Sequence, residues 1–115
     1  MKRLKGKKQI EILFEEGRSI NAFPFRLIFL ESSEAAIGIS VGKKNFKLAV
    51  DRNRIKRQMR ESAKKIFVPL LNESKNNYYL MLVYIGKEKP TFTQVETKMN
   101  LLFEKFLNKV AAKNI

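Results

Sequence analysis

Apolar residues recur at helical spacing in three parts of the chain, and each part predicts an amphipathic helix. Near the N-terminus, Ile10, Leu13 and Phe14 lie at i, i+3 and i+4 before Gly17, which predicts a short helix over residues 8–16. A second stripe predicts a central helix over residues 50–71 and consists of Ile55, Met59, Ala63, Ile66, Phe67 and Leu70. A third stripe predicts a closing helix and consists of Val95, Met99, Leu102, Phe103, Phe106 and Val110.

Four residues indicate where the two longer helices begin and end. Thr93 and Glu96 have the spacing of a capping box, so we expect the closing helix to start there. The simplest role for Asp51 is the N-cap of the central helix. Pro69 lacks a backbone N–H, so the last turn of the central helix should kink or stop near Val68.

Three extended runs lie between these helices. Residues 22–31 predict a strand, with a short extra strand near residues 18–21. Residues 36–42 alternate in size, so Ile37, Ile39 and Val41 share one face of a strand. Residues 78–85 are apolar without alternation, which predicts a central strand covered on both faces.

The second face of the strand at 36–42 carries almost no side-chain bulk, because it presents Gly38, Ser40 and Gly42. Either a helix packs closely over this face, or the face is the floor of a groove where a polymer approaches the backbone. Both interpretations remain open, and each can hold at a different point along the strand.

The order of elements predicts an α+β fold. We expect a two-layer α–β sandwich, in which three helices pack on a small mixed sheet of about four strands. With 115 residues, the chain fits a single domain over residues 1–115.

The charge distribution predicts a nucleic-acid partner. The chain has 24 Lys and Arg against 11 Asp and Glu, a net charge of +13. Residues 1–8 carry five basic residues and no acid, residues 43–65 carry ten basic residues and two acids, and the remaining charges cancel. Charge gathered in two segments is typical of a binding surface rather than of ordinary solvation. Phe14 and Phe25 border these segments and are the candidates for stacking on unpaired bases.

Several functions are disfavoured by what the sequence lacks. It contains no Cys and no His, which removes thiolate chemistry, Cys-ligated zinc and the usual general acid and base. Asp51 is the only Asp, and Glu15 and Glu16 diverge on a helix, so no carboxylate cluster for a two-metal nuclease is evident. We therefore expect no catalytic residues, no metal site and no small-molecule substrate. No apolar run is long enough to span a membrane, and we expect a cytoplasmic protein with no membrane partner.

One segment resembles a known family. Residues 49–61 read AVDRNRIKRQMRE, which is similar to the Arg-Asn-Arg signature of the bacterial ribonuclease P protein component. The strand and Lys-Lys at 37–44, the helix and Gly at 13–19, and the closing helix over 91–106 are similar as well. This resemblance covers nearly the whole chain.

The resemblance implies a function and a topology. It implies a subunit that binds a catalytic RNA, ribonuclease P RNA, and helps it remove the 5′ leader of precursor tRNA. It implies that Mg²⁺ is bound by the RNA, with no cofactor in the protein. It also implies a left-handed βαβ crossover, against the usual handedness.

The resemblance also implies residue roles. The positions that would face the partner RNA are Lys43, Lys44, Arg52, Asn53, Arg54, Lys56, Arg57, Arg60 and Lys64. A cleft between the first helix and the sheet would receive the single-stranded leader. Phe14 and Phe25 match aromatic positions of that cleft, and Ile10 and Ile28 stand where the family often has Phe and Tyr.

Two other functions fit the composition. A ribosomal or RNA-chaperone module could share the same basic sandwich without assisting a ribozyme. A cationic surface could instead bind anionic membranes or DNA, although that use favours a wide exposed apolar helix face, and the predicted strands are sufficient to bury the apolar stripes.

Overall fold

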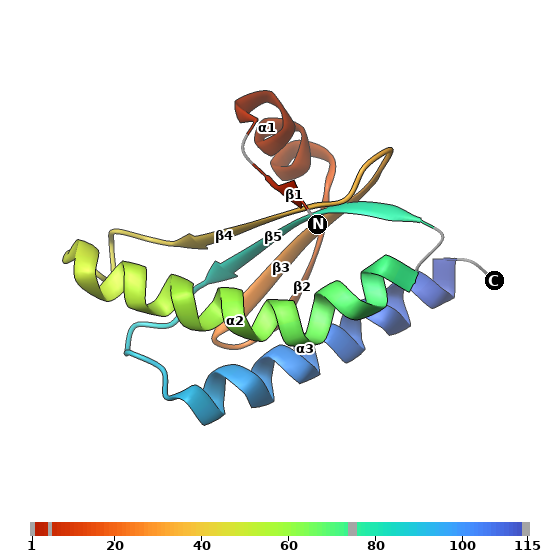
Figure 1. The fold of residues 1–115 in the computed structure, drawn as a ribbon. Coiled ribbons are helices and arrows are strands. Elements are labelled where there is room, and N and C mark those ends of the chain that lie inside the picture. The colour runs from red at the N-terminus through yellow and green to blue at the C-terminus, as the bar shows by residue number, and fades with distance from the viewer. Residues whose placement is uncertain (1, 5, 74–75, 114–115) are drawn as a thin grey trace.

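A computed structural model describes residues 2–4, 6–73 and 76–113 of the chain (Figure 1). Within these residues, three helices and five strands follow one another. They are β1 (Lys2–Arg3), α1 (Lys7–Glu16), β2 (Arg18–Ala22), β3 (Phe25–Ser32), β4 (Ala36–Val41), α2 (Ala49–Glu73), β5 (Asn77–Tyr84) and α3 (Phe92–Lys113).

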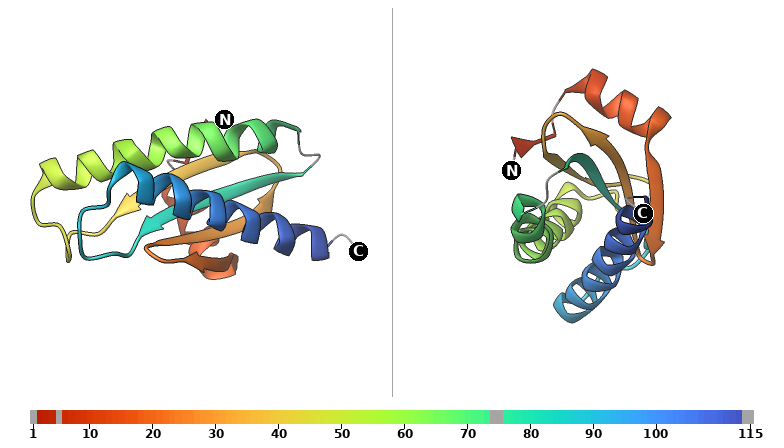
Figure 2. Two further views of the ribbon diagram at one scale, coloured as in Figure 1. Left: turned by 90° about the horizontal axis from the view of Figure 1, so that it is seen from below. Right: turned by 90° about the vertical axis from the view of Figure 1, so that its right-hand side faces the viewer.

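The strands form one mixed sheet in the order β1-β4-β5-β3-β2. The pairs β1–β4 and β4–β5 are parallel, whereas β3–β5 and β2–β3 are antiparallel. Helices α2 and α3 lie side by side against one face of the sheet, and α1 lies over the opposite face (Figures 1 and 2). The α+β prediction is confirmed, and β5 is the central strand, with a neighbour on each side and both faces covered.

The connection from β4 through α2 to β5 joins two adjacent parallel strands, and it is left-handed (Figure 2). Nearly all such connections in proteins are right-handed. The handedness implied by the resemblance is therefore correct, although no local sequence pattern predicts it.

Two apolar clusters hold the layers together. The larger lies between the sheet and helices α2 and α3, and its fully buried side chains include Phe25, Phe67 and Phe106. The smaller lies between the sheet and α1, and it contains Leu4, Leu13, Ile28, Ala36 and Met81. The rigid sheet thus carries α1 on one face and the basic helix α2 on the other.

The boundaries of α2 correct two predictions. Helix α2 continues through Pro69 to Glu73, so it does not stop near Val68; the neighbouring Phe67 is fully buried and anchors this part of the helix. The first helical hydrogen bond of α2 runs from Arg52 N to Leu48 O at 3.2 Å, which places Asp51 inside the first turn rather than at the N-cap.

The capping box of α3 lies two residues before the predicted one. Gln94 N donates to Thr91 Oγ1 at 3.2 Å, and Thr91 N donates to Gln94 Oε1 at 3.0 Å. Thr93 and Glu96 lie inside the helix. Both pairs have the same sequence spacing, and the helical hydrogen bond from Val95 N to Thr91 O at 3.1 Å shows that the helix begins at the earlier one.

The two short strands had different outcomes. The extra strand near residues 18–21 is present as β2, paired with β3 from Arg18 to Ala22. Strand β1 was not predicted, because two residues in a basic run give no alternation.

The sequence also placed Leu70 in the apolar stripe of the central helix. Its side chain lies outside the described side chains.

Candidate nucleic-acid interface

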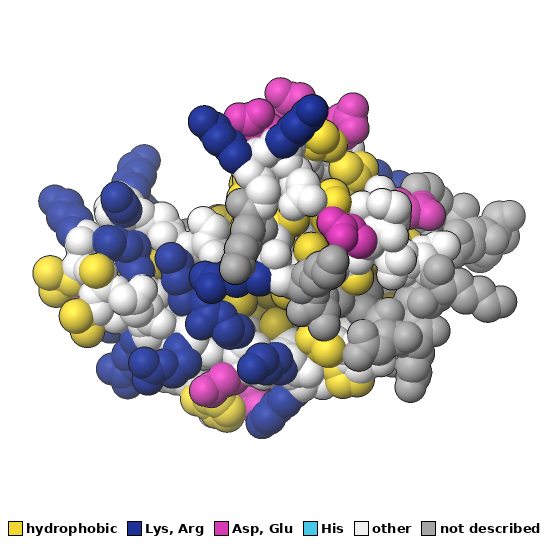
Figure 3. Space-filling view, turned by 45° about the horizontal axis from the view of Figure 1, so that its top comes forward, with side chains coloured by type: hydrophobic (Ala, Val, Ile, Leu, Met, Phe, Trp, Pro, Cys, Tyr) yellow, Lys and Arg dark blue, Asp and Glu magenta, His cyan; other side chains and the backbone are white. Residues whose placement is uncertain are grey.

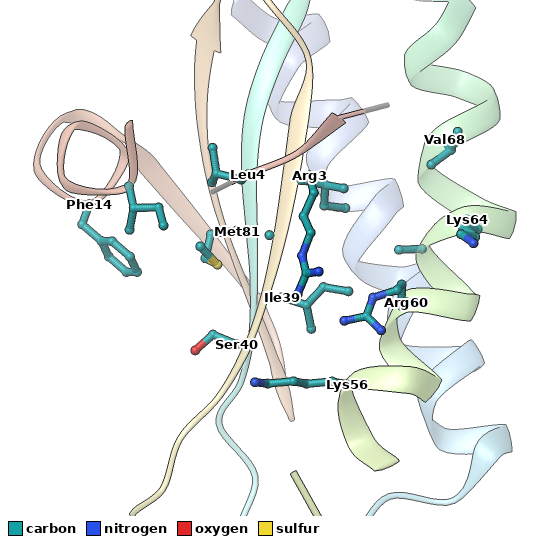
Figure 4. A pocket seen from close by; sticks show the side chains of 14 residues that line it. Arg3, Leu4, Phe14, Ile39, Ser40, Lys56, Arg60, Lys64, Val68 and Met81 are labelled. Atoms are coloured by element: carbon teal, nitrogen blue, oxygen red, sulfur yellow. The ribbon is translucent and has the colours of Figure 1, made fainter. Parts of the chain in front are cut away.

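The central feature of the site is a cavity of about 790 Å³ between α1, the edge of the sheet at β4, and α2 (Figure 4). Residues from five elements, β1, α1, β4, α2 and β5, line it together with Leu4. They are Arg3, Leu4, Ile10, Phe14, Ile37, Gly38, Ile39, Ser40, Lys56, Arg60, Ala63, Lys64, Val68 and Met81. Its floor is aliphatic, and its α2 wall is cationic.

The cationic wall is a row of three residues on α2, which we call the inner row. Lys56, Arg60 and Lys64 are four residues apart, so they lie on one side of the helix with a rise of about 6 Å per step. All three line the cavity. In the part of the chain that the structure describes, none of them has an ion-pair partner. Their charges are therefore available to an anion that enters the cavity.

The opposite wall belongs to α1. The Phe14 side chain is 53% exposed and lines the cavity with Ile10 (Figure 4). Leu13, the residue before Phe14, is fully buried in the smaller cluster and holds α1 on the sheet. Leu13 thus anchors the helix that presents the exposed ring of Phe14.

The strand between these walls shows why its second face is small. A Cβ atom on Gly38 would lie 2.8 Å from Met81 Cε and 3.4 Å from Leu4 Cβ, so Gly38 permits close packing. Ser40 lines the cavity, and nothing lies within 4 Å of a Cβ built on Gly42. The close packing at Gly38 is therefore against Met81 of β5 and Leu4 rather than against a helix, and the groove floor beside Ser40 stays a prediction.

A second group of basic residues lies further round α2 and on the turn before it, and we call it the outer group. Asn53, Arg54 and Arg57 are exposed on the helix, and Lys43 and Lys44 are exposed on the turn after β4. Figure 3 shows Lys and Arg side chains gathered over this side of the molecule, with acidic side chains over α1. The basic groups predicted from the sequence thus share one side of the molecule.

Arg52 has a different environment from its neighbours. Its Nη1 donates to Phe46 O at 2.8 Å and to Lys47 O at 2.9 Å. These bonds hold the segment that leads into α2, where Phe46 is part of the larger apolar cluster. The guanidinium is therefore engaged within the protein, whereas its predicted role was to face RNA.

Two described basic residues near α2 form ion pairs. Lys65 Nζ lies 3.3 Å from Glu96 Oε1 and links α2 to α3. Lys89 Nζ lies 3.0 Å from Asp51 Oδ1, so the loop before α3 is tied to the first turn of α2. Neither pair includes the inner row or the outer group.

The structure corrects one residue of the predicted cleft and qualifies another. Phe25 is fully buried in the larger cluster, on the face covered by α2 and α3, where its ring makes an edge contact with Tyr84 at 5.6 Å between centroids. It cannot stack on a base in a cleft beside α1. Ile28 faces α1 but is buried beneath it in the smaller cluster, and it does not line the cavity.

Sequence reasoning missed several cavity residues. Arg3 reaches the cavity from β1, and its side chain extends toward Ile39 and Arg60 in Figure 4. The excess charge of residues 1–8 was a signal for Arg3, but its position beside β4 depends on strand pairing. Ile37 and Ile39 are half-buried at the sheet edge and Met81 is buried in β5, and periodicity alone could not show that all three line the cavity.

Among the described residues, no group of three or more His, Cys, Asp or Glu residues is placed to hold a metal ion. None of the described helices combines the length and apolar character that crossing a membrane requires. What the site offers is cationic side chains, one exposed aromatic ring and an aliphatic floor.

Comparison with known proteins identifies the family. The Ribonuclease P family model matches residues 1–107. The ribonuclease P protein component of Porphyromonas gingivalis is 31% identical over 105 residues, which cover 84% of this chain and 77% of that one. The component of Legionella pneumophila is 32% identical over 105 residues, which cover 90% and 87%.

Solved structures show the same fold. The RNase P protein of Staphylococcus aureus matches with a TM-score of 0.74 at 22% identity, over 90% of this chain and 94% of that one. The RNase P protein of Thermotoga maritima matches with a TM-score of 0.72 at 24% identity, over 90% and 97%. The chain therefore belongs to the family of ribonuclease P protein components, which are part of a tRNA-processing ribonucleoprotein enzyme.

Proposed function

We propose that this chain is the cytoplasmic protein subunit of ribonuclease P, which binds the catalytic RNA and the single-stranded 5′ leader of precursor tRNA. In this role it promotes endonucleolytic removal of the leader, and the RNA carries out the hydrolysis with its own Mg²⁺. The observation that carries the proposal is the cavity lined on one wall by Lys56, Arg60 and Lys64 and on the other by Phe14.

The inner row suits the phosphates of the leader. Three cations at intervals of about 6 Å along one helix can each neutralise one phosphate of an extended strand. The bases of such a strand would point away from α2, toward the aliphatic floor and Phe14. We therefore reassign Lys56, Arg60 and Lys64 from the catalytic RNA to the leader.

The outer group suits the catalytic RNA. Arg54 and Arg57 are exposed and do not line the cavity, and Arg offers a planar fork that fits phosphate oxygens. Lys43 and Lys44 extend the same surface beyond the end of β4. Helix α2 would thus serve two RNAs with two sets of side chains.

Base stacking in the cleft should be limited to Phe14. Among the described residues that line the cavity, Phe14 is the only aromatic one, and Ile10 takes a place where the resemblance implies an aromatic residue. Stacking on one ring contributes about 1–3 kcal/mol, so the cations should supply most of the leader affinity. Leader binding by this protein should accordingly be strongly salt-dependent.

Reconstitution with a bacterial ribonuclease P RNA tests the proposal. At low Mg²⁺, the protein should stimulate 5′ maturation of precursor tRNA, because it neutralises phosphates that Mg²⁺ would otherwise screen. An absence of stimulation would reject the proposal and leave a ribosomal or RNA-chaperone module as the better hypothesis.

Variants test the division of labour. Arg54→Ala and Arg57→Ala should weaken binding of the catalytic RNA, and Phe14→Ala and Lys56→Ala should weaken binding of leader-bearing precursor to the holoenzyme. Lys109→Ala, an exposed cation on α3, is the matched control and should change neither. Equal effects of all four variants on both measurements would contradict the division.

A further inference from the structure

The outer edge of β4 is only partly covered by β1. Strand β1 pairs with Ala36 and Ile37, and Leu4 N donates to Ile37 O at 2.9 Å. Helix α1 begins at Lys7. Among the described residues, no strand continues along this edge beside residues 38–41. An uncovered edge presents backbone N–H and C=O groups that are free to pair.

The register shows which backbone groups of β4 point away from β5. Backbone groups of alternate strand residues point to the same side, and the Ile37 carbonyl points outward to Leu4. The N–H and C=O of Ile39 therefore also point outward, whereas those of Gly38 and Ser40 point inward to β5. Ile39 lines the cavity, so its outward groups lie at the cavity wall.

A donor and an acceptor side by side select the chemistry of the ligand. A phosphate accepts hydrogen bonds but donates none, so the Ile39 carbonyl would repel it. The edge of an unpaired nucleobase carries a donor beside an acceptor and complements both groups. An extended peptide could also pair with the edge, as in strand addition.

The surroundings favour the nucleobase over the peptide. Four cations line the same cavity, namely Arg3 and the inner row, so an entering chain needs a negative charge at nearly every step. A nucleic acid supplies this regularly, whereas a peptide would need a run of acidic residues. The exposed ring of Phe14 adds a stacking surface that unpaired bases use.

We propose that the outward N–H and C=O of Ile39 form paired hydrogen bonds to one unpaired base of the precursor leader. This inference rests on the proposed function, because it assumes that the leader occupies the cavity. The main chain of β4 then has a positioning role. The sheet edge holds one base of the leader, and the phosphates of the leader contact α2.

A proline substitution tests the main-chain contact. Ile39→Pro removes the outward N–H but no sheet hydrogen bond, which edge strands tolerate, and Ile39→Val keeps the N–H as the matched control. Reconstituted holoenzyme is titrated with intact precursor tRNA and with precursors carrying a single abasic nucleotide at each leader position. Ile39→Pro should bind the intact precursor roughly three- to tenfold more weakly than Ile39→Val does.

The abasic series identifies the contacted base. One abasic position should cause the same loss with the wild-type protein and no additional loss with Ile39→Pro. If Ile39→Pro lowers the melting temperature, a backbone ester at residue 39, introduced by semisynthesis, removes the same N–H. A folded N–H-deleted protein that binds every precursor like Ile39→Val would overturn the inference.

Two further outcomes are distinguishable. Stable binding of an acidic extended peptide that leader RNA does not displace would also overturn it, in favour of strand addition. A wild-type holoenzyme that binds leader-bearing and leaderless precursor equally well would instead refute the proposed function itself.

Discussion

The guanidinium of Arg52 donates a hydrogen bond of 2.8 Å to the carbonyl of Phe46 and thereby closes the turn that leads into α2. Arg52 belongs to the Arg-Asn-Arg signature, and its neighbour Arg54 is exposed. Two arginines of one motif thus have different tasks, the first within the protein and the second on its surface.

Replacing these arginines should separate stability from RNA binding. Arg52→Ala should lower the free energy of unfolding by about 1–3 kcal/mol, because two carbonyl acceptors lose a charged donor. Arg54→Ala should change it by no more than about 0.5 kcal/mol while weakening binding of the catalytic RNA. Urea denaturation and RNA titration measure the two effects, and equal stability of both variants would contradict the assignment.

The two phenylalanines next to the basic segments should also behave differently. Phe25→Ala should destabilise the protein by about 3–5 kcal/mol, because it leaves a cavity in the larger cluster. Phe14→Ala should leave stability nearly unchanged and reduce leader affinity by about 1–3 kcal/mol. Thermal unfolding measures the stability of both variants, and precursor binding measures their leader affinity. A stable Phe25→Ala protein with a defect in leader binding alone would show that Phe25 lies in the cleft after all.

The helix cap of α3 offers a matched comparison. Thr91→Ala removes the side-chain acceptor for Gln94 N and should cost about 0.5–2 kcal/mol of stability. Thr93→Ala, at the position that the sequence pattern suggested, should cost distinctly less. Chemical denaturation of the two variants decides between the positions, and a larger loss for Thr93→Ala would favour the later cap.

Stability at high pH should depend on Tyr84. Burial, together with the nearby charge of Glu88, raises the pKa of the Tyr84 hydroxyl above its usual value. The folded state therefore holds this proton more tightly than the unfolded state, so stability is constant below pH about 10 on this account and falls above it. Tyr84→Phe should be less stable at pH 7 and should lose less stability above pH 10. Parallel falls in both proteins would refute this role.

Helix and strand positions followed from the sequence because burial leaves a regular period, as in the stripe that contains Ile55, Met59 and Phe67. What periodicity cannot supply is the assignment of a buried side chain to one of two cores. Phe25 and Ile28 are both apolar residues of β3, yet they lie on opposite faces, in different clusters.

The site was predicted as a set of basic residues but not as two sets. Lys56 and Arg57 are adjacent in sequence, and only the placement of α1 and β4 shows that the first lines the cavity and the second does not. The contribution of Arg3 depends on a parallel pairing between β1 and β4, which joins segments more than thirty residues apart. Such pairings leave no local pattern.

The inner row and Arg57 belong to one 25-residue helix. The distance between a leader RNA in the cavity and an RNA on the outer surface is therefore set by a continuous, rigid α-helix. A loop would let the two ligands drift relative to each other, whereas α2 keeps their separation and relative rotation constant. Inserting one residue between Arg57 and Arg60 would rotate the part of α2 after the insertion by about 100° relative to the part before it. The two sets of basic side chains would then be misaligned, although every charge would still be present.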